Sequence, residues 1–397
     1  MSIMFRAKSQ PFLRVGDELM PKTLNVGMIG YKFMGRAHSN AWLQADKFFD
    51  LKAKPILKVI CGREKSGVMN ACTRWGWNQF VTDWHEVVED STIDIIDINT
   101  PNDTHAEIAI AAAKAGKAIL CEKPLALDVR QAKQMVEAVK KAGVVNMVCH
   151  NYRRIPAIVQ AKRMIEAGEL GTIYHYRARY AQDWIVDPNF PLVWRLQSKI
   201  AGSGTHGDID AHIIDLGRYL IGEFSEVCGQ METFIKERPL PGESSKKGKV
   251  TVDDAVMFIG RFANGALANL EATRFALGRK NGIEIEINGS KGSLVFDLED
   301  MNRLKYYNEA DPADRRGFRD IIVTQGGGVH PYVGNWWPPG HIIGYEHTFV
   351  HTIADFINAV VDKRSVQPTF EDGLANQIVL EAVEKSAKMH RWVKLGK

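Results

Sequence analysis

The chain has 397 residues, of which 45% are hydrophobic and 25% are charged, and its net charge is +4. This length predicts two domains with sizeable cores, and the small, scattered positive charge argues against nucleic acid as a partner. No apolar run approaches the roughly 20 residues of a membrane-spanning helix, and five cysteines without pairing or metal spacing favour the reduced cytoplasm.

Residues 1–21 lack the apolar core of a signal peptide and are expected to form an extension or a covering strand. From residue 22 to residue 150, short apolar segments alternate with amphipathic ones. Strands are expected at 24–30, 55–62, 93–100, 118–124 and 144–151, and helices at 36–49, 66–76, 105–116 and 129–143. This alternation predicts an α/β domain whose parallel sheet is covered by helices on both faces.

The pattern changes after residue 150. A helix is expected at 156–170, followed by a strand at 172–184 in which aromatic and polar residues alternate. Two hairpins are expected at 252–275 and 281–300, around Asn-Gly and glycine-rich turns, and a last helix at 373–391. Residues 151–397 are therefore predicted to form a second α/β domain with a large, mostly antiparallel open sheet.

The segment GYKFMG, from Gly30 to Gly35, lies between the first strand and the first helix, the setting of the dinucleotide-binding pattern G-x-G-x-x-G. Lys32 replaces the middle glycine, whose missing side chain normally lets the backbone approach the pyrophosphate. The lysine ammonium could pair with phosphate instead, and the helix N-terminus still offers free N–H groups. The alternative is a solvated lysine in a plain strand–turn–helix.

The second predicted strand ends in Gly62-Arg63-Glu64, where a carboxylate would be expected to hold the adenosine ribose. Arg63 could meet the 2′-phosphate of NADP or stack on adenine, or it could be an ordinary surface residue. Glu64, one or two positions after the expected place, could supply this carboxylate. These residue types leave the choice between NAD and NADP open.

Polar residues also follow the next two strands, at Thr100-Pro101-Asn102 and at Glu122-Lys123-Pro124. Ligands of open α/β sheets bind at the carboxyl ends of the strands, so these segments are expected to form two edges of one site. A lysine at the end of a buried strand is costly unless it is paired or functional. We interpret Lys123 as functional, and a structural ion pair with Glu122 is the alternative.

Three segments together make the chain similar to the glucose–fructose oxidoreductase and inositol dehydrogenase (Gfo/Idh/MocA) family: GYKFMG in its strand–helix setting, TPNDTHAEIAIAAAKAGKAILCEKPLA, and GDIDAHIID. The segments ICGRE, RYAQDWIVDPNFPLVWR and AGSGTHGDIDAHIIDL resemble the family's levoglucosan dehydrogenase-like branch. The resemblance implies a Rossmann domain at 22–150 and a substrate-binding and oligomerisation domain at 151–397. It implies oxidation of a ring hydroxyl of a sugar, anhydrosugar, glycoside or cyclitol, at C3 in that branch. NAD is the favoured cofactor with NADP as the second choice, and a homodimer or homotetramer through the second sheet is expected.

By motif, the resemblance assigns catalysis to Lys123, Asp208 and His212. Residues four apart share a face of a helix, so Asp208 and His212 are expected to point together. Histidine can take the hydroxyl proton near neutral pH, and Lys123 can stabilise the charge that develops on the same oxygen. Whether His212 or Lys123 is the formal base stays open, and Asp208 could fix the imidazole or bind a neighbouring hydroxyl.

A metal site is the alternative for this segment, built from His206, Asp208, Asp210, His212 and Asp215. Residues at such close positions cannot all face one point on a helix, so we predict no metal. His206 and Asp210 also depart from the family pattern, which leaves the identity of the substrate open.

The remaining site residues are candidates for contacts to the cofactor or to the substrate. The segment 179–195 mixes aromatic rings with polar groups, as sugar sites do. Cofactor contacts are expected from Gly30, Lys32, Phe33, Met34, Gly62, Arg63, Thr100, Pro101, Asn102, His105, Glu122, Lys123, Trp194 and Arg195. Substrate contacts are expected from Lys123, Tyr152, Arg153, Gln182, Trp184, His206, Asp208, His212 and His341.

Two other functions use the same residues. An NAD-retaining glycosidase would oxidise its substrate transiently and release a free sugar without net NADH. A non-enzymatic sugar or cofactor sensor would keep the fold, but the intact set of Lys123, Asp208 and His212 argues against it.

Overall fold

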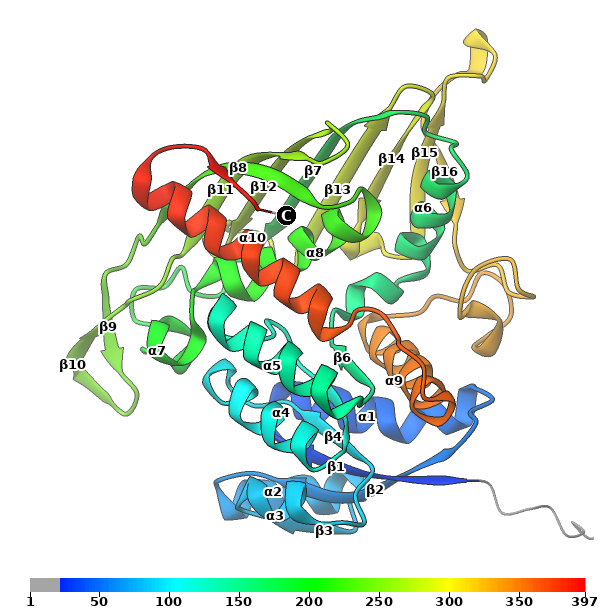
Figure 1. Cartoon of the computed structure of the whole chain (residues 1–397). Helices are drawn as coiled ribbons and strands as arrows, with labels where there is room; N and C mark the ends of the chain where they lie inside the picture. Colours follow the sequence, from blue (N-terminus) through cyan, green and yellow to red (C-terminus); the bar gives the residue numbers. More distant parts are fainter. Residues whose placement is uncertain (1–21, 397) are drawn as a thin grey trace, which may run out of the picture.

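The computed structural model describes residues 22–396, so the extension expected at 1–21 lies outside the described residues. Two sheets dominate the chain: a six-stranded sheet in the first part and a nine-stranded sheet in the second (Figure 1). None of the helices between residues 22 and 396 is both long and apolar enough to span a membrane.

The first sheet is entirely parallel, in the order β3-β2-β1-β4-β5-β6. Its strands are β1 (Thr23–Ile29), β2 (Lys54–Cys61), β3 (Gln79–Val81), β4 (Ile95–Ile98), β5 (Ala118–Cys121) and β6 (Asn146–Val148). Its helices are α1 (Phe33–Phe48), α2 (Lys65–Trp75), α3 (Trp84–Glu89), α4 (His105–Lys114) and α5 (Val129–Ala142). The central strands β4 and β5 are buried at every position, because both faces of the sheet are covered.

This architecture confirms the predicted Rossmann fold. The order of the strands reverses between β1 and β4, and in such sheets ligands bind at the carboxyl ends of the strands at this point. The segments singled out in the sequence follow β1, β2, β4 and β5 directly. The fold therefore gathers them at one edge.

The second sheet has the order β16-β15-β14-β13-β7-β12-β11-β8-β17. Its strands are β7 (Ile173–Ala181), β8 (Phe224–Glu232), β11 (Ala255–Phe262), β12 (Leu267–Thr273), β13 (Gly282–Gly289), β14 (Gly292–Asp297), β15 (Arg303–Asn308), β16 (Arg319–Ile322) and β17 (Val393–Lys394). All neighbours are antiparallel except β7 and β12, which confirms the mostly antiparallel sheet. A separate ribbon joins β9 (Glu237–Leu240) and β10 (Glu243–Lys249).

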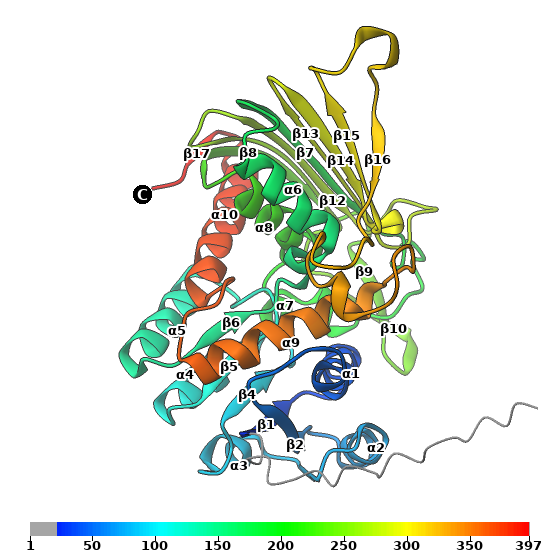
Figure 2. The same cartoon turned by 90° about the vertical axis from the view of Figure 1, so that its right-hand side faces the viewer.

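The helices of this part are α6 (Pro156–Glu166), α7 (Ser198–Ala201), α8 (Ala211–Leu220), α9 (Tyr345–Asp362) and α10 (Phe370–Met389). Short turns are η1 (Asn102–Thr104), η2 (Asn151–Arg154), η3 (Trp194–Leu196), η4 (His206–Asp210), η5 (Leu298–Asp300), η6 (Ala313–Arg315) and η7 (Val333–Asn335). Helices α6, α8 and α10 lie on one face of the nine-stranded sheet, and the opposite face carries no helix of the described chain (Figure 2). Along β11, buried and exposed residues alternate, as expected for a sheet covered on one side.

Helix α9 returns to the first sheet and packs along α1 (Figure 2). Phe349 and Phe356 of α9 share one hydrophobic core with Trp42 of α1 and Met28 of β1. Segments from the end of the chain therefore complete the core beneath the first sheet.

Candidate active site

The loop between β1 and α1 has the tight geometry that a cofactor loop needs. Gly30 has a φ of +108°, and a Cβ atom there would lie 2.3 Å from the backbone oxygen of Asn99. A Cβ atom at Gly35 would lie 2.3 Å from the backbone oxygen of Gly30. No side chain of the described residues caps the N-terminus of α1 at Lys32, and Phe33 is 59% exposed. The free N–H groups of this helix end fit the pyrophosphate of a dinucleotide.

The end of β2 is shaped by Tyr31 and Glu64. A Cβ atom at Gly62 would lie 2.2 Å from the Tyr31 ring, so only glycine leaves room for that ring. Glu64 caps α2: its carboxylate accepts hydrogen bonds from the backbone N–H of Ser66 at 2.9 Å and of Gly67 at 2.6 Å. Glu64 therefore already has a structural role, whereas the neighbouring arginine, Arg63, is exposed.

The loops after β4 and β5 meet, as expected, and His105 lies beneath them. Its ring nitrogens are 3.0 Å from the backbone oxygens of Pro124 and Thr100. His105 is fully buried and holds the two loops together, and its assignment as a cofactor contact stays a prediction. Asn102 is also largely buried and donates to the backbone oxygen of Ala201 at 2.9 Å, which ties the first loop to α7.

Glu122 likewise faces inward. Its carboxylate lies 3.0 Å from Nε2 of His38, and Nδ1 of His38 lies 3.0 Å from both oxygens of Asp97. Burial would lower the pKa of His38, but Asp97 and Cys149 outweigh it and hold the pKa well above 6.5. Glu122 is 4% exposed, so its carboxylate is engaged inside the protein, and its cofactor contact stays a prediction. The donor atoms of His38, Glu122 and Cys149 all lie within 4.8 Å of one another, but His38 is already bonded on both nitrogens.

Lys123 reaches across from the first sheet to the π-helical turn η4. Its Nζ donates to the carboxylate and to the backbone oxygen of Asp208, both at 2.8 Å. The other carboxylate oxygen of Asp208 accepts a hydrogen bond from Arg274 and lies 3.9 Å from Nε of Arg195. Burial alone would raise the pKa of Asp208, but Lys123, Arg274 and Arg195 together hold it well below its usual range. Asp208 is thus a carboxylate among three cations.

His212 lies in the first turn of α8, beside this group. Its ring packs 4.6 Å from that of Tyr152 and 5.9 Å from that of Tyr180, and its Nδ1 is buried without a hydrogen-bond partner among the described residues. Burial and the positive charge of Lys123 hold the pKa of His212 well below 6.5, so the imidazole is neutral at pH 7. The expected helix begins as a π-helical turn, and Asp208 binds Lys123 and Arg274 rather than the imidazole.

His206 and Asp210 bond to partners inside the protein, so the structure gives no support to His206 as a substrate contact. Both are fully buried, Nδ1 of His206 lies 2.7 Å from the Asp210 carboxylate, and Nε2 lies 3.0 Å from the backbone oxygen of Leu380. Burial opposes the charge, but the hydrogen bond to Asp210 raises the pKa of His206 to about 9. The pair anchors η4 to α10, and the five residues of the alternative metal site do not converge.

Arg153 is also a structural residue rather than a substrate contact. It is 5% exposed, and its guanidinium donates to both oxygens of Asp215, at 2.8 and 2.6 Å. His341 is exposed in the loop before α9, where its Nδ1 lies 2.9 Å from the backbone oxygen of Pro338. The structure does not bring His341 into contact with Lys123 or His212.

The other expected substrate residues line up at the end of β7. Gln182 donates to the side-chain oxygen of Asn281 at 2.8 Å and accepts from Nε1 of Trp184 at 2.8 Å. The Trp184 ring lies 5.1 Å from the Arg274 guanidinium, and that of Trp194 lies 4.4 Å from the guanidinium of Arg195. These rings therefore belong to the surroundings of Asp208.

Four residues here were missed in the sequence: Tyr180, Arg274, Asn281 and Tyr345. Arg274 directly follows β12 and is fully buried, so the argument applied to Lys123, a cation at a strand end, would have found it. Tyr180, Asn281 and Tyr345 had no comparable signal, because they meet only through the pairing of β7 with β13 and the return of α9.

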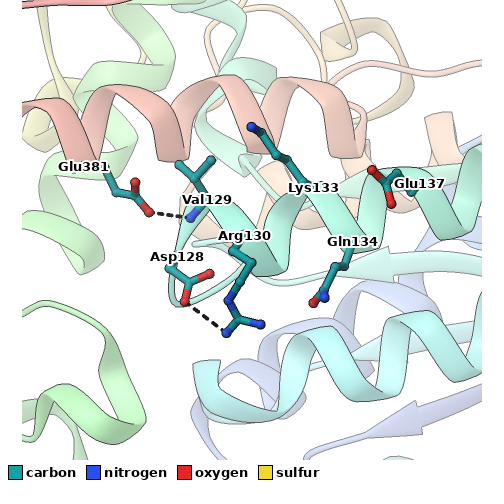
Figure 3. A pocket seen from close by; sticks show the side chains of 7 residues that line it. All are labelled: Asp128, Val129, Arg130, Lys133, Gln134, Glu137 and Glu381. Carbon is teal, nitrogen blue, oxygen red and sulfur yellow. Dashed lines mark hydrogen bonds and ion pairs between the residues drawn. The ribbon is translucent and has the colours of Figure 1, made fainter.

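A surface hollow between α5 and α10 lies apart from this site (Figure 3). Its lining is mostly charged, and the carboxylate of Glu381 accepts from the backbone N–H of Val129 at 2.5 Å. None of the expected site residues lines it. Lys123, Asp208 and His212 lie together elsewhere and offer an ammonium donor, a carboxylate and a neutral proton acceptor.

Known proteins with the same organisation place this arrangement in context. A family model described as an oxidoreductase family with an NAD-binding Rossmann fold matches residues 24–150, and one described as the GFO/IDH/MocA C-terminal domain matches residues 158–295. A levoglucosan dehydrogenase from Pseudarthrobacter phenanthrenivorans is 46% identical over 385 residues, covering 94% of this chain and 98% of that protein.

Solved structures agree with these matches. An oxidoreductase domain protein from Kribbella flavida is 50% identical, with a TM-score of 0.91 over 95% of this chain and all of that one. A levoglucosan dehydrogenase in complex with NADH and levoglucosan is 46% identical, with a TM-score of 0.91 over 94% of this chain and 100% of the other.

Proposed function

Because this chain belongs to the GFO/IDH/MocA family of NAD-binding oxidoreductases, we propose that it oxidises a ring hydroxyl of a carbohydrate to a ketone with NAD. One observation carries the proposal: Lys123 at the end of β5 binds Asp208 beside the neutral imidazole of His212. A buried histidine whose pKa is lowered, beside a carboxylate–ammonium pair, is typical of proton-transfer sites.

We assign the proton acceptor to His212. Its imidazole is neutral at pH 7, whereas Lys123 donates hydrogen bonds to a carboxylate and a carbonyl and so acts as a cation. The ammonium orients the substrate oxygen and stabilises its developing negative charge, and the Nδ1 or Nε2 of His212 takes the proton. The Gly30–Gly35 loop and the N-terminus of α1 would hold NAD, which would supply the acceptor for the hydride.

The substrate is a pyranose, an anhydrosugar or a glycoside. Rings and amides around Asp208, such as those of Trp184, Gln182 and Trp194, suit a polyol with apolar ring faces. A protein 46% identical to this chain is named levoglucosan dehydrogenase, and its crystals held NADH and levoglucosan. Levoglucosan is therefore the first substrate to test.

The experiment has two parts. The purified protein is denatured and its supernatant analysed for NAD and NADP, and the protein is then incubated with NAD and a sugar panel that includes levoglucosan. We expect stoichiometric NADH and keto sugar. A free sugar without net NADH would identify the glycosidase instead, and cofactor binding without any turnover would identify the sensor.

We also propose that the chain assembles through the helix-free face of the nine-stranded sheet. That face exposes large apolar side chains, namely Tyr174 (51% exposed), Met257 (57%), Ile259 (49%) and Leu267 (43%), and such patches mark protein–protein interfaces. Light scattering should give a dimer or tetramer, and Ile259→Glu should dissociate it. A monomeric wild type would overturn this assembly. A cytoplasmic location stays a prediction.

A further inference from the structure

A second cavity lies beside the proposed active site. Its volume is about 580 Å³, within the usual range of small-molecule sites. Asn281 and Tyr345 line it and also belong to the surroundings of His212. The side-chain oxygen of Asn281 accepts from Tyr180 at 2.7 Å, and the Tyr345 ring lies 6.3 Å from that of Tyr152, which packs on His212.

The pairing of the strands explains why the two sites adjoin. Ala181, at the end of β7, pairs with Thr273 at the end of β12 on one side and with Gly282 at the start of β13 on the other. Gln182 directly follows the end of β7, and Arg274 directly follows the end of β12. The cavity is lined by the residues at the same end of β13 to β16, so it begins one strand spacing, about 5 Å, from Gln182.

The lining of the cavity combines polar and apolar groups. Glu299 and Asp300 offer carboxylates, and each has a cationic neighbour at 3.5 Å: Arg279 for Glu299 and Arg303 for Asp300. Arg279 and Arg303 are also shared with Glu284 at 3.0 Å and Asp320 at 3.1 Å, so the lining carboxylates keep acceptor capacity for the hydroxyl groups of a polyol. Ile342, which is 77% exposed, and the Tyr345 ring offer apolar surface for the carbon face of a sugar.

We infer that this cavity binds a second monosaccharide, linked to the ring that is oxidised, so that the preferred substrate is a disaccharide or a longer neutral glycoside. The inference rests on the proposed function, because it takes the oxidised ring to lie between Lys123 and His212. It adds a site for the neighbouring unit, on the far side of Asn281 from the reacting groups.

The test compares matched pairs of substrates: methyl β-glucoside with cellobiose, methyl α-glucoside with maltose, and methyl β-galactoside with lactose, with levoglucosan as a reference of one sugar unit. NADH formation gives kcat/KM for each. For at least one pair we expect the disaccharide to exceed the methyl glycoside by 10-fold or more. Ile342→Trp, which fills the cavity from an exposed loop position, should remove this advantage. The kcat/KM for substrates of one sugar unit should stay within 2-fold of the wild-type value.

Phe318→Trp is the matched control, because Phe318 is 52% exposed and lies just before β16, at the opposite end of the sheet. Equal kcat/KM within every pair, or an equal loss for both members in Ile342→Trp, would overturn the second subsite while leaving the dehydrogenase standing. A change of oligomeric state in Ile342→Trp without a change of specificity would assign the cavity to a second copy of the chain and overturn it too. No NADH from any substrate, levoglucosan included, would overturn the proposed function and this inference together.

Discussion

The ammonium group of Lys123 donates two hydrogen bonds to Asp208, one to its carboxylate and one to its backbone oxygen, each 2.8 Å long. The two residues are 85 positions apart: Lys123 follows β5 of the first sheet, and Asp208 lies in the turn η4 that leads into α8. This contact fixes the distance between the end of β5 and the turn that precedes His212. Proton transfer in this site therefore depends on how the end of β5 and the turn η4 are positioned relative to each other.

Lys123→Met should retain cofactor binding and lose turnover by ~100-fold or more, the usual scale for one group that transfers a proton or stabilises an oxyanion. The measurement is kcat for the best sugar together with the Kd for NAD. Lys114→Met is the control, because Lys114 is an exposed lysine at the end of α4. Unchanged turnover in a folded Lys123→Met protein would remove Lys123 from the mechanism.

Arg274 should act as a positioning residue for Asp208. Arg274→Met leaves the carboxylate with Lys123 and the more distant Arg195, so the carboxylate can shift; we expect kcat to fall ~10–100-fold, the scale of a small misplacement. The Kd for NAD should stay within 2-fold. Arg274→Lys should restore part of the activity, and Arg261→Met, on the exposed side of β11, should change nothing. An unaltered kcat in folded Arg274→Met would contradict this role.

The His206–Asp210 pair should make stability depend on pH. The folded-state pKa of His206 is about 9, above the value of 6.5 expected when unfolded, so its stabilising effect is complete below pH 6.5 and is lost as the pH rises to 9. In that window the free energy of unfolding should fall by up to about 1.4 kcal/mol per pH unit from this group. The carboxyl groups of Asp210, Asp253 and Glu384 act on His206 in the folded state.

Urea unfolding between pH 6 and pH 10 measures this effect. His206→Gln should remove this part of the slope and should unfold more easily at pH 7, by about 3 kcal/mol, because Asp210 loses its cation. His341→Gln, at an exposed histidine, should keep the wild-type slope. Parallel pH profiles for wild type and His206→Gln would show that His206 is not protonated in the folded chain.

Gly30→Ala should abolish NAD binding, because the new Cβ atom would meet the backbone oxygen of Asn99 at 2.3 Å and the loop would have to move. Gly76→Ala separates this collision from simple backbone strain: Gly76 has a φ of +70°, but nothing lies within 4 Å of its added Cβ atom. That control should lose about 1–2 kcal/mol of stability and bind NAD normally. Fluorescence titration with NADH and thermal unfolding measure both variants, and normal binding by Gly30→Ala would contradict the prediction.

The sequence predicts well wherever a residue's role follows from its place at the end of an element. Gly30 and Lys123 are of this kind, because strand ends of a parallel sheet meet at one edge. The α/β alternation and the hairpins followed from local periodicity, so β1, β2, β4 to β7 and β11 to β14 were predicted close to their positions. The strands β3, β8, β15, β16 and β17 were not predicted.

The burial of polar residues could not be predicted from the local sequence. Arg153, Glu122 and His206 are polar residues next to functional segments, and each turned inward to a charged or backbone partner that is distant in the sequence. Asn281 and Tyr345 reach the site through strand pairing and through the return of α9, which no short window of sequence contains.

Helix α9 has a consequence for the order in which the chain acquires its structure during synthesis. Its residues Phe349 and Phe356 fill the core against Trp42 of α1, so the first sheet leaves the ribosome with an uncovered apolar face. Roughly two hundred further residues must be synthesised before α9, which covers that face, is complete. The nascent chain is therefore exposed to aggregation and to chaperones for about half of its translation, and its two halves finish folding together.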